Sequence, residues 1–429
     1  MSGATRRRPY AQMLRDLVWT SGSDGLILIA ALVSFKILGS RLGPEDYGAY
    51  LGTFGVISPL GAITTGGLAL AVMQRHLRDG TTIGDAVRPY LTIILVMAPF
   101  AIAATAAVGS LVIDRLAVGT IALLAYSELV AMSTTSIVAA ATQATSGVGP
   151  ASRIRMMPPL LRMACLLVLA AADAVTVHNA AAAWATAFTV LAVVLVARQL
   201  PRIGTSFGIQ GASREEIGTG LQLSLPTLAN NLQSDADKTI LNGYGLERDA
   251  GLYGAAYRVI KMALLPLRSL NGALFHRFLT HDETQTGQHL RRARSYAAVS
   301  LPMSVVLAVG LWIAAPSLLW LVGDEFEESV SIIRWLALFL PLRSLSQAPL
   351  NGLLGLGRIK PRLVALLTAS ATSLIAYLVL IPYHSWKGAV MGTIGSEVVL
   401  IVLGWGLLVV YQHRHDRSLG LTPVAEQTV

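Results

Sequence analysis

Thirteen ionisable side chains lie within stretches of the chain that are otherwise apolar. Eight are cationic: Lys36, Arg162, Lys238, Arg258, Lys261, Arg268, Arg334 and Arg343. Five are acidic: Asp24, Glu128, Asp235, Asp237 and Glu397. Because the cations exceed the acids and guanidinium groups bind phosphate through two oxygens at once, this surplus predicts a site for an anionic, phosphate-bearing ligand. A site that exports cations would need a surplus of carboxylates.

The segments that position these charges are long enough to cross a membrane. The chain has 429 residues, 54% of them hydrophobic and 13% charged, whereas soluble proteins carry about 25% charged residues. Runs of about 20 apolar residues predict an all-α integral membrane protein with about twelve transmembrane helices. They lie near residues 17–39, 47–74, 89–112, 117–146, 156–172, 178–197, 218–242, 250–275, 297–322, 329–356, 363–382 and 387–411. This composition excludes a soluble, disordered or disulfide-stapled protein.

The distribution of Lys and Arg between the loops predicts the orientation. With twelve spans, the side that holds both termini carries 21 Lys and Arg residues, and the other side carries four, namely Arg41, Arg115, Arg248 and Lys387. Cytoplasmic loops carry the excess of positive charge. We therefore expect both termini in the cytoplasm. The net charge of +9 is explained by these loops, without nucleic acid as a partner.

The two halves of the sequence match at an offset of about 206 residues. The matched pairs are Tyr47 with Tyr253, Tyr90 with Tyr296, Arg153 with Arg358, and His178 with His384. Six spans in each half predict two parallel repeats related by an axis along the membrane normal. We expect an N-terminal six-helix lobe (1–205), a C-terminal six-helix lobe (206–412) and a cytoplasmic tail (413–429). Such an architecture places a central cavity between the lobes. Transport then occurs when one lobe rocks against the other.

The densest group of charges lies on the seventh and eighth spans. On an unbroken helix, Arg258, Lys261 and Arg268 fall within an arc of roughly 80°, which predicts a cationic stripe along a cavity wall. The alternative is pairing with Asp235 and Asp237 on the seventh span. Two acids cannot neutralise these three cations together with Lys238, and we therefore favour the cavity.

Two arginines on other spans are further candidates for the cationic cavity. Arg162 can receive a headgroup from the cytoplasm, or its side chain can extend to the membrane interface. Arg343 lies about 180° from Arg334 on an unbroken helix, and a kink at Pro341 would alter that angle. Arg334 lies near the outer end, where we expect it to reach the interface.

The buried acids have two readings. Asp24, Glu128, Asp235, Asp237 and Glu397 either bind a coupling proton or sodium ion or pair with the arginines and lysines. No sequence motif indicates a nucleotide, a metal or another cofactor. The loops are also too short to present the paired carboxylates of a sugar-processing enzyme, so we expect a protein that is not an enzyme.

Two segments of the chain combine glycine, tyrosine and charged residues in a distinctive order. The first is Leu-Gly-Ser-Arg-Leu-Gly-Pro-Glu-Asp-Tyr-Gly-Ala-Tyr at 38–50, followed by Gly-Gly-Leu at 66–68. The second is Asp-Ala-Asp-Lys-Thr-Ile-Leu at 235–241, followed by Gly-Leu-Tyr-Gly-Ala-Ala-Tyr at 251–257. Both segments resemble those of the polysaccharide flippases of the multidrug/oligosaccharidyl-lipid/polysaccharide exporter superfamily. The resemblance implies two six-helix lobes around a cationic cavity.

The same resemblance implies a place in the bacterial inner membrane and translocation of a polyprenyl-pyrophosphate-linked oligosaccharide from its inner to its outer leaflet for cell-surface polysaccharide biosynthesis. It further implies a monomer that works beside a polysaccharide polymerase and glycosyltransferases. The alternative is an ion-coupled multidrug or toxin antiporter of the same superfamily, which would share the twelve spans and a first-span acid such as Asp24. A membrane glycosyltransferase or polymerase would need a larger outer loop with an acid pair.

Overall fold

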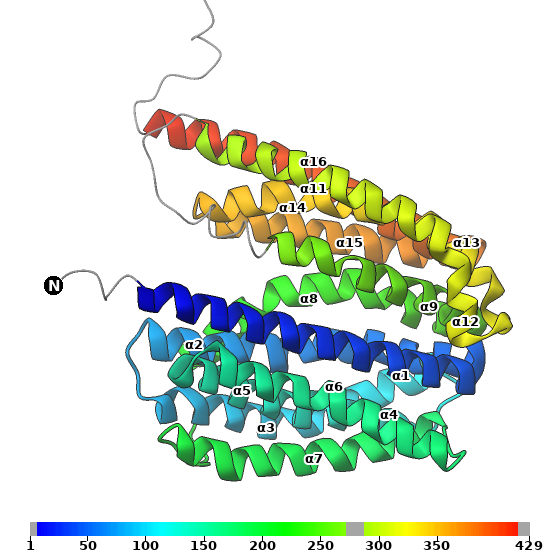
Figure 1. The fold of residues 1–429 in the computed structure, drawn as a ribbon, viewed down its shortest axis with the longest axis horizontal. Helices are drawn as coiled ribbons and strands as arrows, with labels where there is room; N and C mark the ends of the chain where they lie inside the picture. The colour runs from blue at the N-terminus through cyan, green and yellow to red at the C-terminus, as the bar shows by residue number, and fades with distance from the viewer. Residues whose placement is uncertain (1–6, 272–286, 419–429) are drawn as a thin grey trace, which may run out of the picture. The chain divides into compact units, whose positions relative to one another are not determined.

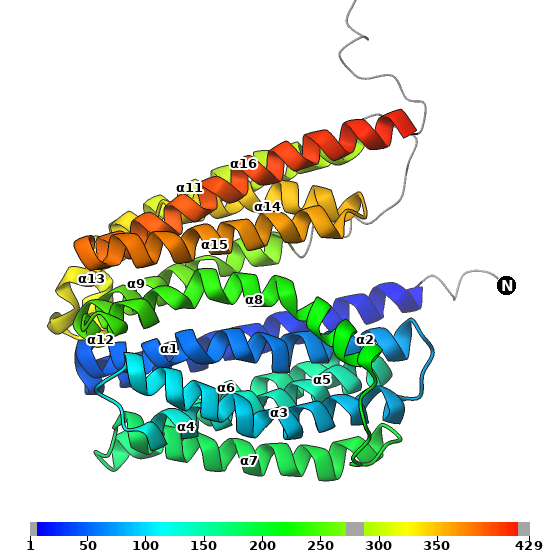
Figure 2. The ribbon, with the colours of Figure 1, turned by 180° about the vertical axis from the view of Figure 1, so that it is seen from behind.

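The computed structural model describes residues 7–271 and 287–418, and within these ranges it is helical and has no strand (Figures 1 and 2). Contacts within the chain divide it into two compact units, Met1–Asn231 and Leu232–Val429. This boundary lies inside helix α8 (Arg214–Gly243), 26 residues after the lobe boundary predicted at 205/206. Residues 413–418 of the predicted tail continue the last helix, and 419–429 lie outside the described residues.

The first unit is a bundle in which α1 packs on α6, α3 on α4, and α4 on α7. Its elements are α1 (Arg7–Gly61), η1 (Ala62–Gly67), α2 (Leu68–Leu77), α3 (Ile83–Val112), α4 (Val118–Tyr126), η2 (Ser127–Met132), α5 (Ser133–Ser146), α6 (Val148–Ala171), α7 (Val177–Arg202) and the first part of α8. At Gly43 the backbone of α1 is not helical (φ 69°, ψ 173°). Since glycine adopts positive φ without steric cost, α1 turns back there towards α2 (Figures 1 and 2). Elements η1 and η2 are π-helical turns.

The second unit packs α15 on α16, α11 on α14, and α13 on α9. Its elements are the rest of α8, α9 (Glu247–Ala263), a helical segment at 265–271, α11 (Gln288–Ala314), η3 (Ala315–Ser317), α12 (Leu318–Val322), η4 (Asp324–Phe326), α13 (Glu327–Leu336), α14 (Phe339–Gly355), α15 (Ile359–His384) and α16 (Trp386–Ser418). The predicted kink is present, with a bend of 41° between α13 and α14. It falls at residues 337–338 because Pro341 has no N–H for the carbonyl of Ala337 four residues earlier.

Within the described ranges, eight helices are long and apolar enough to cross a membrane, or nine if the bent pair α13 and α14 forms one span. The α1–α2 segment, Gly22–Leu77, is counted once in this number although two predicted spans lie on it. The seventh predicted span lies on α8, whose charged side chains lower its hydropathy. The eighth, 250–275, begins on α9 and is interrupted at Leu264, and its residues 272–275 lie outside the described residues. The other predicted spans lie on helices, and the expected all-α membrane fold is confirmed.

The internal duplication is visible in both units. Helix α3 begins at Ile83 and α11 at Gln288, 205 residues later. The matched tyrosines have the same role, since Tyr90 and Tyr296 are each buried in the hydrophobic core of their unit. Tyr47 and Tyr253 are also fully buried.

The first part of α8 is held tightly on the first unit. A Cβ atom added at Gly67 would lie 1.7 Å from the hydroxyl of Ser224 and 2.5 Å from the carbonyl oxygen of Gly220. The Asn231 amide also donates to the carbonyl oxygen of Ser58 at 2.8 Å. The absence of a side chain at Gly67 therefore allows α8 to lie against the start of α2. The rest of the same helix, residues 232–243, belongs to the second unit.

Candidate functional site

The strongest grouping of charges in the second unit is a lysine–tyrosine cluster formed by α8 and α9. Its members are Asp235, Asp237, Lys238, Tyr253, Tyr257 and Lys261. The Lys238 ammonium lies 2.7 Å from an Asp237 oxygen and donates to the Ser234 carbonyl oxygen at 2.6 Å. Lys261 lies 3.0 Å from an oxygen of Asp235, and the same oxygen is 3.8 Å from Lys238. The cluster therefore joins two cations to two carboxylates.

Aromatic rings complete the cluster. The Lys238 ammonium lies 4.3 Å from the ring centre of Tyr257 and 5.3 Å from that of Tyr253, and Lys261 lies 5.1 Å from Tyr257. The rings attract the cations through their negative faces. Sequence reasoning did not assign these tyrosines a role, although a spacing of four residues places Tyr253, Tyr257 and Lys261 on one face of α9.

The two lysines differ in exposure. The side chain of Lys238 is 5% exposed and that of Asp237 is fully buried, so this pair is enclosed by protein. The side chain of Lys261 is 39% exposed and can reach a ligand while it contacts Asp235. Both lysines therefore pair with the acids of the seventh span, which is the alternative that the sequence left open. Their assignment to a substrate site stays a prediction.

The expected stripe of three cations is not formed on one helix. Helix α9 ends at Ala263, and helix resumes at 265 after a turn at Leu264. Pro266 explains the break because it cannot donate to the carbonyl of Met262. Arg258 lies on α9 and is partly buried, whereas Arg268 lies beyond the break and is exposed. The 80° arc was calculated for an unbroken helix, so it does not describe Arg268 beyond this break, and the shared cationic stripe stays a prediction.

The second charged group of this unit is the pair of Arg343 on α14 and Glu397 on α16, whose closest atoms are 2.6 Å apart. Glu397 is fully buried and also accepts hydrogen bonds from the Ser346 hydroxyl at 2.7 Å and the Gln233 amide at 3.3 Å. These partners supply what a buried carboxylate needs, namely a counterion and hydrogen bonds.

A hydrogen-bonded chain connects the two groups. The Tyr377 hydroxyl donates to the carbonyl oxygen of Gln233 at 2.9 Å, and it lies 2.9 Å from the Thr393 hydroxyl. The Thr393 hydroxyl is in turn 3.0 Å from that of Tyr253. The lysine–tyrosine cluster and the Arg343–Glu397 pair therefore belong to one buried polar network. No sequence pattern indicated the roles of Gln233, Tyr377 and Thr393, since they lie on three separate helices.

The first unit contains an arginine box, defined by Glu128, Arg162, Phe54, Trp184 and Phe188. Arg162 on α6 forms an ion pair with Glu128 on the π-helical turn η2. Its guanidinium carbon lies 4.9 Å from the ring centre of Trp184, 5.5 Å from Phe188 and 5.9 Å from Phe54. The box holds the Arg162 cation between a carboxylate and three aromatic rings. The side chain of Arg162 therefore contacts other helices of the unit.

The remaining predicted charges lie at the surface of their units. Asp24, near the start of α1, is exposed, as is Lys36. Arg334 is exposed on α13 and lies 4.8 Å from the ring centre of Trp312. In residues 22–271 and 287–417, no three His, Cys, Asp or Glu side chains are close enough to hold a metal ion together. The structure thus brings four of the five predicted acids against predicted cations.

No protein-family model and no curated protein sequence matches the chain. Solved structures do. An inward-facing multidrug resistance MATE family transporter of the MOP superfamily aligns with a TM-score of 0.68 at 16% identity, over 90% of this chain and 95% of that one. An outward-facing structure of such a transporter gives 0.63 at 15% identity, over 93% and 96%. A MOP superfamily transporter from Pyrococcus furiosus, described as having a binding pocket of reverse polarity, gives 0.65 at 16% identity, over 92% and 96%. The chain therefore has the fold of the MATE transporters of the MOP superfamily.

Proposed function

We propose that the chain is a flippase that moves a polyprenyl-pyrophosphate-linked oligosaccharide from the inner to the outer leaflet of the bacterial cytoplasmic membrane. It does so by alternating access, as a monomer, and supplies the polymerase of cell-surface polysaccharide biosynthesis. The observation that carries this proposal is the surplus of cations over acids, eight to five, on the apolar helices. A pyrophosphate needs such a surplus, since arginine and lysine replace the water that it loses.

The ion pairs support an anionic substrate over a cationic one. Glu128, Asp235, Asp237 and Glu397 each contact an arginine or lysine of the chain. A cationic drug would have to compete with a tethered cation for each carboxylate. A phosphate instead meets cations that are at least partly exposed, such as Lys261 with 39% of its side chain accessible and the exposed Arg268.

The carboxylates then have a role in the absence of substrate. An uncompensated charge within the membrane costs free energy. The acids lower this cost when no substrate is bound to the cations. When pyrophosphate binds, its oxygens take the place of Asp235 beside Lys261. A proton or sodium ion that binds the released carboxylate would couple the step to an ion gradient, a role that we assign to the same acids and to Asp24.

The test is translocation of a fluorescent polyprenyl-pyrophosphate oligosaccharide in proteoliposomes. The variant Arg258→Ala/Lys261→Ala/Arg268→Ala is expected to insert normally and lose flipping. The control, Arg248→Ala/Lys387→Ala, removes exposed cations predicted on the outer side and is expected to flip at the wild-type rate. Equal flipping by wild type and triple variant would refute the site but keep the function. No flipping by wild type with several glycans would refute the function.

The second candidate is an ion-coupled multidrug antiporter. Asp24, an exposed carboxylate on the first helix, favours it, because such an acid can bind either a proton or a cationic compound. The measurement that separates the two is proton-driven efflux of ethidium from the same proteoliposomes. Efflux that disappears in Asp24→Asn, without flipping of the lipid-linked sugar, would favour the antiporter.

A further inference from the structure

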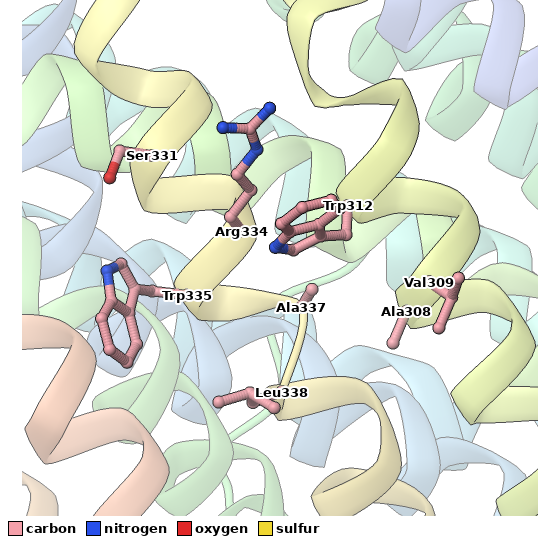
Figure 3. A pocket seen from close by; sticks show the side chains of 8 residues that line it. All are labelled: Ala308, Val309, Trp312, Ser331, Arg334, Trp335, Ala337 and Leu338. Atoms are coloured by element: carbon pink, nitrogen blue, oxygen red, sulfur yellow. The ribbon is translucent and has the colours of Figure 1, made fainter.

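An apolar groove with a single cation lies on the second unit, between α11 and α13. It has a volume of about 480 Å³ and is lined by Ala308, Val309, Trp312, Ser331, Arg334, Trp335, Ala337 and Leu338. Figure 3 shows the Arg334 guanidinium at one end, Leu338 at the other, and Trp312 and Trp335 on opposite sides. The groove is separate from the lysine–tyrosine cluster and the Arg343–Glu397 pair.

The walls of the groove are apolar and accessible. Trp312 is 51% exposed, Trp335 57% and Leu338 51%. Side chains that are exposed on the membrane-spanning part of a protein contact lipid. Tryptophan is enriched where the hydrocarbon meets the headgroups, and the predicted topology places the nearby end of α11 at the outer side of the membrane. The tryptophans therefore indicate that the groove lies at the level of the outer-leaflet headgroups.

The charge of Arg334 has no carboxylate to offset it among the described residues. Its guanidinium carbon lies 4.8 Å from the ring centre of Trp312, and within 22–271 and 287–417 no ion pair includes it. The ring covers one face of the planar group, so the N–H edge stays available for an acceptor. An arginine edge beside an apolar groove matches a molecule with a phosphate at one end and a hydrocarbon chain at the other.

We propose that this groove binds an anionic phospholipid of the membrane. Its phosphate lies on the N–H edge of Arg334, beside the hydroxyl of Ser331. One acyl chain passes between Trp312 and Trp335 towards Leu338. The volume of the groove is within the range of about 300–1,000 Å³ that is typical of ligand pockets. The proposal requires only that the chain lies in a membrane, and it does not depend on what the protein transports.

The test measures lipid preference in vesicles of phosphatidylcholine that contain a small fraction of a brominated lipid. Bromine quenches nearby tryptophans, and the brominated lipid is either phosphatidylglycerol or phosphatidylcholine. The wild-type protein is compared with Arg334→Gln and with Arg248→Gln, a matched control that removes an exposed cation of the same predicted side. Both residues are at the surface, so both variants are expected to fold.

We expect brominated phosphatidylglycerol to quench the wild type at lower concentration than brominated phosphatidylcholine. The preference should fall about fivefold in Arg334→Gln, the factor expected for loss of one basic side chain near an anionic lipid, and persist in Arg248→Gln. Equal quenching of the wild type by both lipids would overturn the proposal. So would a preference that survives in Arg334→Gln, or one that falls equally in Arg248→Gln, which would assign it to general surface charge.

Discussion

Substitution of Glu128 by glutamine tests the arginine box directly. The change keeps the size of the side chain and removes its charge, so Arg162 remains as an uncompensated cation between aromatic rings. Removing one partner of a fully buried ion pair costs about 3–5 kcal/mol, whereas exposed pairs contribute about 0–1 kcal/mol. The two side chains are 23% and 18% exposed, which places the expected loss at about 2–3 kcal/mol.

The double variant Glu128→Gln/Arg162→Met tests whether the two charges interact. It removes both charges and keeps an unbranched apolar side chain against the rings. Because an ion pair replaced as a whole by neutral groups costs little, the double variant should be more stable than either single variant. The coupling free energy is expected to be about 2 kcal/mol.

The chain supplies its own reporter for this measurement. Cys165, its single cysteine, lies on α6 three residues beyond Arg162, with its sulfur 3.9 Å from the carbonyl oxygen of Ala183 on α7. A thiol-reactive dye that fluoresces on modification therefore reports separation of α6 from α7. For a unit of 231 residues, 2–3 kcal/mol lowers the unfolding midpoint by about 5–10 °C.

Arg155→Gln on the same helix is the control. Arg155 is exposed, and its guanidinium forms a hydrogen bond with the uncharged side chain of Gln143. The substitution should therefore change the free energy of unfolding by no more than about 0.5 kcal/mol. The reasoning is refuted if Glu128→Gln unfolds at the wild-type temperature. It is also refuted if the two single effects add in the double variant, because additive effects mean that the charges do not interact.

Three further predictions concern other contacts. Gly67→Ala should lower the unfolding temperature by an amount equivalent to about 1–3 kcal/mol, since its new methyl group meets α8, whereas Gly119→Ala, with open space around it, should not. Lys238→Met should destabilise the second unit by about 3–5 kcal/mol because it leaves Asp237 buried without its counterion. Circular dichroism during heating would measure this loss, and wild-type stability of the variant would contradict it. Tyr377→Phe removes one donated hydrogen bond and should cost about 0.5–1.5 kcal/mol in the same measurement; no loss would exclude the buried network as a source of stability.

The helices could be predicted from the sequence because membrane spans need long apolar runs, and this signal is local. The duplication was also readable, since Tyr90 and Tyr296 are each required in the core of a unit. The π-helical turns were not readable, because they depend on how η1 and η2 pack and no residue type specifies them. The break at Leu264 had a visible cause in Pro266, but the arc calculation assumed an unbroken helix.

The site could be predicted as a set of charges but not as a set of contacts. Sequence shows that Asp235, Asp237 and Lys238 lie close together on one helix. It does not show that Lys261 contacts Asp235, since that choice depends on how α8 and α9 pack. The arginine box is even harder to predict from the sequence, because Phe54 and Trp184 lie on helices more than a hundred residues apart. The four-residue spacing of Trp184 and Phe188 on α7 is the one local trace of it.

The 205-residue spacing between the starts of α3 and α11 has a consequence for ancestry. A half-length precursor with an even number of spans begins and ends on the same side of the membrane. A second copy joined to its end then inserts in the same direction, and every basic loop of the copy keeps its original side. Tandem gene duplication could therefore have produced the full chain in one step, with no need to redistribute arginines between the loops.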